Sequence, residues 1–171
     1  VDGHFKPEKK KSAYRDKLIF VLGKDVKKGV TGLRILQMNI QNAGGECVRL
    51  RYFAEKNEIA ESTIRNCGVQ NFVFDGDGKN GEGVYIGTAP EQEKDGTNPT
   101  KDKDVSQYNW IHHNTFDTQG NECVDIKEGS TKNIIEHNSC TGQQDKDSAG
   151  LDSRGNENVF RYNTIFGNRG A

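Results

Sequence analysis

The sequence predicts an all-β fold, namely a right-handed single-stranded parallel β-helix of about six to seven coils. Three observations predict it: an eight-residue phrase that returns about every 25 residues, a second strand that precedes the phrase, and an unusual composition. Of the 171 residues, 32% are hydrophobic and 29% are charged, which is apolar-poor for a globular core but suits a narrow column. The 20 glycines and only 3 prolines indicate many tight bends rather than a disordered chain.

The repeated phrase centres on the pattern Asn-x-apolar-x-x-Asn-x-apolar. Its copies begin at residues 33, 57, 109, 133 and 158, and their third and eighth positions are always apolar. The phrase is too short for an amphipathic helix, so it predicts two short strands joined by a bend. We expect asparagine at the bend to take the left-handed backbone conformation. The starts lie 24, 52, 24 and 25 residues apart, and the 52 corresponds either to two periods or to one coil with a long insertion.

Stacking of the coils would place like residues above one another. We therefore expect ladders of side-chain amides, of the kind found in cross-β stacks. The two predicted ladders are the columns Asn57, Asn109, Asn133, Asn158 and Asn114, Asn138, Asn163.

A second strand precedes the phrase, in the segments 46–51, 82–87, 122–127 and 149–154. Side chains alternate along a strand, so two apolar residues in each of the first three copies are predicted to point inward. These are Val48 and Leu50, Val84 and Ile86, and Val124 and Ile126. The outward pairs are Arg49 and Arg51, Tyr85 and Gly87, Asp125 and Lys127, and Asp152 and Arg154. The strands together predict a coil of triangular cross-section, whereas the hairpins of a β-sandwich would not return one phrase with one polarity.

The remaining segments are irregular parts of a single domain, 1–171. Residues 1–16 are polar and are predicted to form an N-terminal extension or cap, followed by a buried strand at 17–22. Residues 87–107 form a polar insertion, which is either a wall of a binding face or a plain surface loop. The chain stops at 168–171 inside what resembles a further coil. We expect an open C-terminal coil that belongs to a longer β-helix or associates end to end with a partner.

Charge and hydropathy exclude two classes of partner. The net charge of −1 gives no electrostatic footprint for nucleic acid or an anionic membrane, and no apolar run has the ~20 residues of a membrane span. We expect a secreted or extracellular protein, and because no signal peptide is visible the sequence would then be its mature form. The spacing of Cys47, Cys67, Cys123 and Cys140 fits no zinc site and leaves open whether they form disulfides or pack as small hydrophobic residues.

The outward residues of the second strand contain the candidate site. Neighbouring coils lie ~4.8 Å apart, so Lys127 and Arg154 are predicted to be direct neighbours, with Asp125 and Asp152 beside them. Arg49, Arg51 and Tyr85 lie in the same rows and, together with Asp125 and Asp152, are candidates for binding substrate. The competing interpretation is a solvated ladder of opposite charges, which is ordinary on a sheet surface.

The segments Glu122-Cys-Val-Asp-Ile-Lys127, 133–138 and Leu151-Asp-Ser-Arg154-Gly-Asn resemble the active-site stretch of chondroitinase-B-like alginate lyases. These enzymes belong to the pectate-lyase-like superfamily of right-handed parallel β-helices. The resemblance covers about 35 residues and implies an acidic polysaccharide as substrate. It implies that Lys127 takes the proton, that Arg154 assists at the leaving oxygen and that Glu122 helps to hold calcium. The second glutamate of the family pattern falls on Gly120.

The predicted function is cleavage of a uronate-containing polysaccharide by β-elimination. This reaction removes a weakly acidic C5 proton, and a cation such as calcium or arginine must neutralise the adjacent carboxylate. The runner-up is a non-catalytic β-helix that binds carbohydrate or serves a structural role, since fold alone does not decide function. Asp125 and Asp152 as a glycosidase pair is a weaker alternative.

Two further groups of polar residues carry less weight. His112, His113 and His137 are predicted to be ordinary histidines at bends, although segment 109–116 also resembles a pectate lyase phrase with His112 in place of an aspartate. Glu46, Glu82 and Glu122 recur at one coil position. Such a column is either a feature of the bend or part of a calcium site, and we favour the bend except at Glu122.

Overall fold

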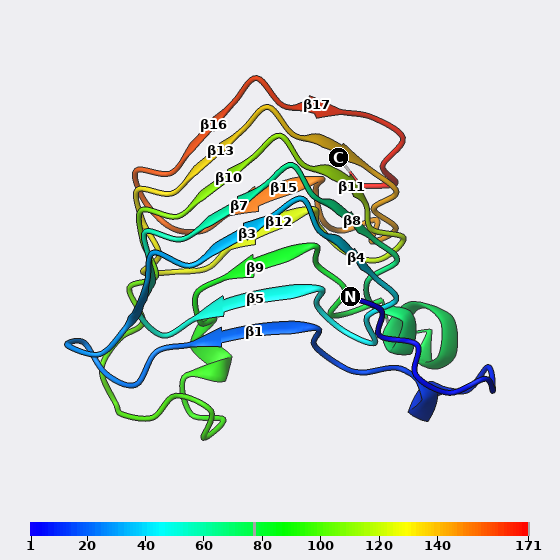
Figure 1. Ribbon diagram of the computed structural model, residues 1–171, viewed down its shortest axis with the longest axis horizontal. Coiled ribbons are helices and arrows are strands. Elements are labelled where there is room, and N and C mark those ends of the chain that lie inside the picture. The colour runs from blue at the N-terminus through cyan, green and yellow to red at the C-terminus, as the bar shows by residue number, and fades with distance from the viewer. Residues whose placement is uncertain (77, 171) are drawn as a thin grey trace.

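Three parallel sheets run along the chain and form the faces of a triangular coil in the computed structural model, which describes residues 1–76 and 78–170 (Figure 1). The first sheet contains β1 (Ile19–Leu22), β5 (Val48–Arg51), β9 (Val84–Ile86), β12 (Val124–Ile126) and β15 (Leu151–Ser153). The second contains β3 (Arg34–Leu36), β7 (Glu58–Ala60), β10 (Trp110–His112), β13 (Ile134–Glu136) and β16 (Val159–Arg161). The third contains β4 (Asn39–Gln41), β8 (Thr63–Arg65), β11 (Thr115–Asp117), β14 (Ser139–Thr141) and β17 (Thr164–Ile165). This arrangement confirms the predicted parallel β-helix.

The number of coils differs from the prediction. Each of the three sheets has five strands, so the described residues form five coils rather than six to seven. The difference arises at the 52-residue interval, because β10 pairs directly with β7 and aligns Trp110 with Glu58. The interval is therefore one coil with two insertions, one containing the π-helix η2 (Gln70–Asp75) and the other, at 87–107, containing the 3-10 helix η3 (Pro90–Gln92).

The asparagine ladders are present. In the first column, the Nδ2 atom of each asparagine donates to Oδ1 of the next, at 3.1 Å from Asn57 to Asn109 and 3.0 Å from Asn109 to Asn133. The same Oδ1 atom of Asn109 also accepts a hydrogen bond from the backbone N–H of Asn57, at 3.1 Å. The second column repeats this pattern from Asn114 to Asn138 at 3.0 Å. The ladders thus satisfy buried backbone donors at both corners of the second sheet.

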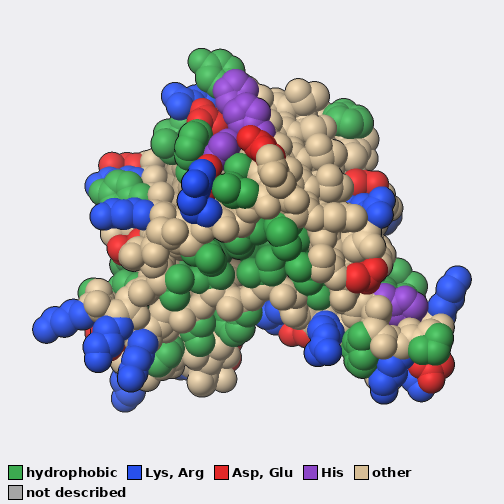
Figure 2. Space-filling model, viewed as in Figure 1, with side chains coloured by type: hydrophobic (Ala, Val, Ile, Leu, Met, Phe, Trp, Pro, Cys, Tyr) green, Lys and Arg blue, Asp and Glu red, His purple; other side chains and the backbone are tan. Residues whose placement is uncertain are grey.

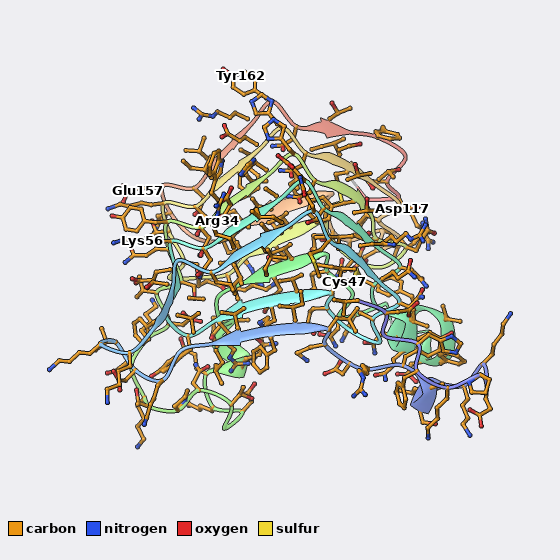
Figure 3. All side chains as sticks on the ribbon, in the orientation of Figure 1. Arg34, Cys47, Lys56, Asp117, Glu157 and Tyr162 are labelled. Atoms are coloured by element: carbon orange, nitrogen blue, oxygen red, sulfur yellow. A yellow bond between two sulfur atoms is a disulfide. The ribbon has the colours of Figure 1, made fainter. Side chains whose placement is uncertain are left out.

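The left-handed bend residue is not the asparagine, contrary to the prediction. The positive φ belongs to the residue just before it, such as His113 (53°), Lys132 (57°) and His137 (55°). The asparagine is fixed by the ladder and must point inward, so the preceding residue makes the turn and points outward. Figure 3 shows two residues of this class, Lys56 and Glu157, at one corner of the coil and a third, Tyr162, at the next corner.

The core is a narrow column of aliphatic side chains. The predicted inward residues of β5, β9 and β12 are fully buried, as are Ile59, Ile111, Ile135 and Phe116 from the other two sheets. Each such side chain stabilises the fold by about 1.5–3 kcal/mol relative to exposure. The column therefore fixes the position of each strand of the first sheet along the axis of the β-helix, and with it the position of the outward residues of that strand.

Two disulfides answer the question that the cysteine spacing left open. Cys47 bonds to Cys67 and Cys123 bonds to Cys140, with Cα–Cα distances of 5.5 and 5.9 Å. Each bond joins the residue before a strand of the first sheet to the region of the third sheet in the same coil. Each disulfide thus closes one coil of the solenoid.

The polar N-terminal segment and the last coil lie at the two ends of the column. Residues 1–16 include a short 3-10 helix, η1 (Lys11–Ala13), and Asp2 forms a parallel bridge with Gln41 of β4. A small sheet of β2 (Val30–Thr31) and β6 (Ala54–Glu55) lies at one corner. At the other end, Ile165 and Phe166 are about half exposed. The last residue of the predicted open coil, Ala171, lies outside the described residues, and end-to-end association stays a prediction. Within the described part of the chain, no helix is long and apolar enough to cross a membrane.

Candidate functional site

A row of polar side chains runs across the outer face of the first sheet. The strand registers align Arg49 with Tyr85, Tyr85 with Asp125, and Asp125 with Asp152. Lys127 and Arg154 continue β12 and β15, and the backbone N–H of Arg154 donates to the carbonyl of Ile126 at 2.8 Å. The predicted neighbourhood of these residues is therefore present, because the alternation of side chains and the stacking of coils fix it.

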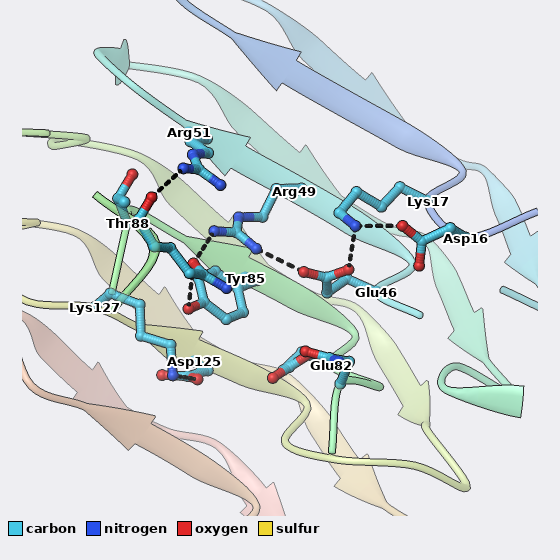
Figure 4. Close-up of polar contacts among 12 residues, drawn as sticks. Asp16, Lys17, Glu46, Arg49, Arg51, Glu82, Tyr85, Thr88, Asp125 and Lys127 are labelled. Carbon is cyan, nitrogen blue, oxygen red and sulfur yellow. Dashed lines mark hydrogen bonds and ion pairs between the residues drawn. The ribbon is translucent and has the colours of Figure 1, made fainter. Parts of the chain in front are cut away.

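Lys127 lies at the centre of this row. Its Nζ atom forms an ion pair with Oδ2 of Asp125 and lies 4.6 Å from the centroid of the Tyr85 ring. The guanidinium of Arg49 lies over the same ring, at 3.6 Å (Figure 4). Tyr85 thus separates two cations and contacts both by cation–π interactions. Lys127 is only 8% exposed, so this part of the face is compact rather than an open platform.

Arg154 is more accessible than Lys127. Its side chain is 40% exposed, and Nη1 lies 3.3 Å from Oε1 of Glu128. Partial burial acts to lower the pKa of Arg154, but the carboxylates of Asp125 and Glu128 outweigh it and raise that pKa. Arg154 is therefore a fixed positive charge beside Lys127.

Asp152 borders a hollow whose lining includes neither Arg154 nor Lys127. Its Oδ1 atom accepts a hydrogen bond from the backbone N–H of Ser153 at 2.8 Å, and its side chain is partly exposed. The hollow has a volume of about 340 Å³ and is lined by Asp152 together with residues 146–149. A sugar chain could reach the row from this side.

Arg49 and Arg51 are buried beneath the 87–107 insertion. Arg49 donates to Glu46 at 2.6 Å and to Gln92 at 2.7 Å, whereas Arg51 pairs with Asp95 at 3.0 Å. Both arginines line a second hollow of about 420 Å³ that also contains Lys17 and Gln92. The insertion therefore walls the β5 end of the row, away from Arg154. Their predicted contact with substrate would have to occur through this hollow.

Three carboxylates converge beside Lys127. One oxygen each of Glu82, Glu122 and Asp125 can be chosen so that all lie within 4.8 Å of one another, and all three residues are buried. Burial and then repulsion from Glu46, Glu122 and Asp125 raise the pKa of Glu82 to about 8. Burial and repulsion from Asp125 raise the pKa of Glu122 to about 7. Burial also raises the pKa of Asp125, although Lys127 opposes the shift.

Glu82 is the residue of this group that the sequence interpretation assigned to the bend. The signal that could have found it was present, because Glu82 recurs one coil before Glu122 at the same position. The long insertion between the two coils obscured their direct stacking, which the register of β9 with β12 establishes.

The histidines lie on a different part of the molecule. His113, His137 and Tyr162 stack along the corner between the second and third sheets, with centroids 4.9 and 5.0 Å apart. His112 stacks on Trp110 and lies 3.1 Å from a Glu58 oxygen. Figure 2 shows histidine side chains gathered at this corner. His113 and His137 lie at bends, as predicted, whereas His112 belongs to β10 and is buried.

Comparison with known proteins supports the fold. No protein-family model and no curated protein sequence matches this chain. Among solved structures, the crystal structure of alginate lyase from Paenibacillus sp. str. FPU-7 is similar, with a TM-score of 0.60 and 22% sequence identity. The match covers 85% of this chain and 56% of that one, so the chain spans just over half the length of the lyase. The chain thus shares the parallel β-helix fold of an alginate lyase.

Proposed function

We propose that this protein is a polysaccharide lyase that cleaves an acidic, uronate-containing polysaccharide by β-elimination. The observation that carries the proposal is the placement of Lys127 and Arg154 on adjacent strands, with Asp125 ion-paired to Lys127. The similar fold of an alginate lyase supports it. A pair of basic side chains held on adjacent coils is suited to an anionic sugar chain.

The chemistry assigns one role to each basic residue. The Lys127 ammonium first gives its proton to solvent, and the neutral amine then takes the proton from C5 of the uronate. The electron pair of that C–H bond forms the C4–C5 double bond while the C4–O bond breaks. Arg154 stabilises the negative charge that develops on the leaving oxygen, which takes up a proton from solvent as the product departs. In this scheme Asp125 orients the ammonium of Lys127 between catalytic cycles.

The carboxylate of the sugar needs a positive partner, which lowers the energy of the carbanion-like state. We propose calcium for this role, with Glu122 as a ligand. The buried carboxylates around Glu122 have the hard oxygen donors that calcium prefers. The exposed guanidinium of Arg154 supplies a second positive charge close by.

The other residues of the row are proposed to bind substrate. Asp152 borders one hollow, and Arg49 and Arg51 line the other hollow, under the insertion. Tyr85 and Asp125 position Lys127 between them. The two disulfides favour an oxidising compartment, which supports the proposal that the protein is secreted.

The test is the ultraviolet absorbance of unsaturated uronate on alginate, pectate, glucuronan and glycosaminoglycans. Each polymer is assayed with calcium and with a chelator, using the wild-type chain, Lys127→Ala and Arg154→Ala. Arg154→Ala is informative because removing a half-exposed arginine leaves no deeply buried charge unpaired. Lys132→Ala, at a corner away from the row, is the matched control. We expect activity on at least one polymer that both site variants lose and the control retains.

A non-catalytic carbohydrate-binding role is the second candidate. The 8% exposure of Lys127 favours it, because a base that is so covered has little room to meet a sugar carbon. In that case, no polymer would give the absorbance, yet affinity electrophoresis would show one polymer retarding the wild-type chain and Arg154→Ala weakening the effect.

A further inference from the structure

A cleft crosses the corner between the third and first sheets, and its lining contains none of the residues of the row. Its volume of about 640 Å³ exceeds that of the hollows of about 340 and 420 Å³ described above and lies in the usual range for ligand sites. We call it the corner cleft, and its lining includes Phe72, Val73, Gln119, Gln144, Lys146 and Arg169.

Unequal connections from the third sheet to the first sheet shape this cleft. The connection after β8 has 18 residues (66–83) and the one after β14 has nine (142–150), whereas the one between them, after β11, has six (118–123). Coils lie ~4.8 Å apart, so the two longer connections stand on either side of a gap one coil wide. The longer connections form the walls of the cleft, and the short one forms its floor.

One wall is the π-helix η2, which exposes apolar side chains to the cleft. None of its six residues is buried, Val73 is 65% exposed and Phe72 is half-buried. Exposed apolar surface is unfavourable in water, and a ligand that covers it recovers that free energy. π-Helical turns are rare and occur frequently at functional sites. The helix thus adds nothing to the core but gives the cleft an apolar wall.

The N-terminal segment holds η2 in place. Lys11 forms an ion pair with Asp75, and Nε2 of Gln70 donates to the carbonyl of Tyr14 at 3.0 Å. The ring of Phe74 lies 5.8 Å from that of Tyr14. Figure 1 shows η2 beside the dark blue N-terminal segment. The wall is therefore braced on the side of Phe74, which does not line the cleft.

Phe72 offers a fixed aromatic ring to the cleft. A Cβ atom at Gly68 would lie 2.9 Å from the ring of Phe72, and one at Gly81 would lie 3.0 Å from it. The two glycines thus let the ring pack directly against the backbone of the connection. A ring that is already immobilised loses little conformational freedom when a ligand stacks on it.

The remainder of the cleft is polar, and its described residues have no net charge. The cations of Lys146 and Arg169 are balanced by the carboxylates of Asp145 and Asp147. Side-chain amides complete the lining, from Asn66, Gln119 and Gln144. Amides and carboxylates can donate to and accept from hydroxyl groups. The cleft therefore differs from the row of Lys127 and Arg154, which has the basic residues to attract an anionic polymer.

A sugar ring fits this combination of groups. A pyranose has an apolar face of C–H groups, which packs on an aromatic ring, and a rim of hydroxyl groups, which pair with amides and carboxylates. The hollow that Asp152 borders shares Lys146 and Asp147 with the corner cleft. A continuous surface thus joins the cleft to one end of the row.

We propose that the corner cleft is a second carbohydrate-binding site, in which Phe72 stacks on a pyranose ring of a polysaccharide. The surrounding amides and charged groups bind the hydroxyl groups of that ring. The site goes beyond the proposed lyase activity, because it requires neither Lys127 nor a carboxylate on the sugar. It holds the polymer to the molecule outside the row.

Affinity electrophoresis tests the site with alginate, pectate and their uncharged ester forms, propylene glycol alginate and methyl-esterified pectin. The Arg154→Ala chain is used, so that the row neither cleaves the polymer nor binds it fully. We expect at least one polymer to retard this chain in both its acidic and its ester form. Adding Phe72→Ala should lower the affinity about tenfold in both forms, because the stacked ring is lost. Phe74→Ala, the same change on the same helix, should leave the affinity unchanged.

Phe72→Trp separates a loss of stacking from a loss of structure. The chain has one tryptophan, Trp110, on the second sheet, so Phe72→Trp in a Trp110→Phe chain gives a single fluorescent reporter in the cleft. This variant should bind at least as tightly as the parent chain. Addition of the polymer should shift its emission to shorter wavelength, because a sugar ring displaces water from the indole.

The outcomes separate the cleft from the activity. Undiminished affinity in Phe72→Ala, an equal loss in Phe74→Ala, or no retardation by any of the four polymers would overturn the site. An emission shift without any unsaturated product from the wild-type chain would uphold the site and count against the lyase. Unsaturated product together with an unshifted emission would uphold the lyase and overturn the site.

Discussion

Glu46 and Glu82 occupy the same position in successive coils, and both are buried. At Glu46, burial alone would raise the pKa, but the adjacent cations of Arg49 and Lys17 outweigh it, so the pKa is lowered. At Glu82, burial is reinforced by neighbouring carboxylates and the pKa rises to about 8. One coil position therefore gives a closed ion pair in one region and an open acidic cluster in the next. The difference lies in the outward residue three positions later, which is Arg49 after Glu46 and Tyr85 after Glu82.

The largest loss of stability should come from breaking the buried ion pair between Glu46 and Arg49. Arg49→Met leaves Glu46 with Lys17 alone and should cost about 3–5 kcal/mol, because one partner of a buried pair is removed. Urea unfolding followed by circular dichroism measures the loss. The double variant Arg49→Met/Glu46→Gln should recover most of the stability, and a double variant as unstable as the single one would show that Arg49 acts through packing instead.

The pH dependence of stability should have opposite signs in the two regions. Glu82 and Glu122 have folded pKa values of about 8 and 7, above the ordinary 4.5, so the folded chain binds more protons. In a chelator, stability should therefore fall as pH rises from about 5 to 8, and the shift of Glu82 alone corresponds to up to roughly 4 kcal/mol. Glu46, whose pKa is lowered, should contribute stability that is lost below about pH 4.5.

Thermal melts between pH 4 and 9 measure these slopes. Glu82→Gln should make the decline between about pH 5 and 8 shallower, with the share of Glu122 remaining, and should leave the acid limb unchanged. Calcium should also flatten the decline, since it replaces the protons. A decline that is as steep in Glu82→Gln as in the wild-type chain would assign it to groups other than Glu82.

The contribution of a disulfide to stability should be the same in the two regions. Cys47–Cys67 closes the coil of Glu46 and Cys123–Cys140 closes the coil of Glu122, with separations of 20 and 17 residues. Replacing either pair with serines should cost about 3 kcal/mol in the chain-entropy model, with no resolvable difference between them. Unequal losses in denaturant unfolding would show that one coil depends on its disulfide for more than closure.

The smallest change in stability should come from the exposed ion pair between Arg154 and Glu128. Glu128→Gln removes the partner of Arg154, and both side chains are about a third or more exposed. The change should alter the free energy of unfolding by less than about 1 kcal/mol. If the lyase proposal holds, the same variant should change the activity more than the stability, which a steady-state assay beside a melt would reveal.

The repeat explains how much of the site was visible in the sequence. The period and the alternation of side chains predicted the inward column, the asparagine ladders and the adjacency of Lys127 and Arg154. These features depend only on stacking at a fixed spacing, so a local pattern is enough to define them. The number of coils was not visible in this way, because a 52-residue interval fits two periods as well as one coil with insertions.

The tertiary structure alone decided which charges meet. It placed the 87–107 insertion over Arg49 and Arg51, paired the four cysteines, and brought Glu82 against Glu122 and Asp125 across an insertion. It also gave the left-handed bends to the residues before the asparagines, since the ladder fixes the asparagines themselves. The physical reason is the same in each case. Burial and electrostatics depend on which segments lie over a sheet face, and the repeat determines which residues form the face but not which segments pack against it.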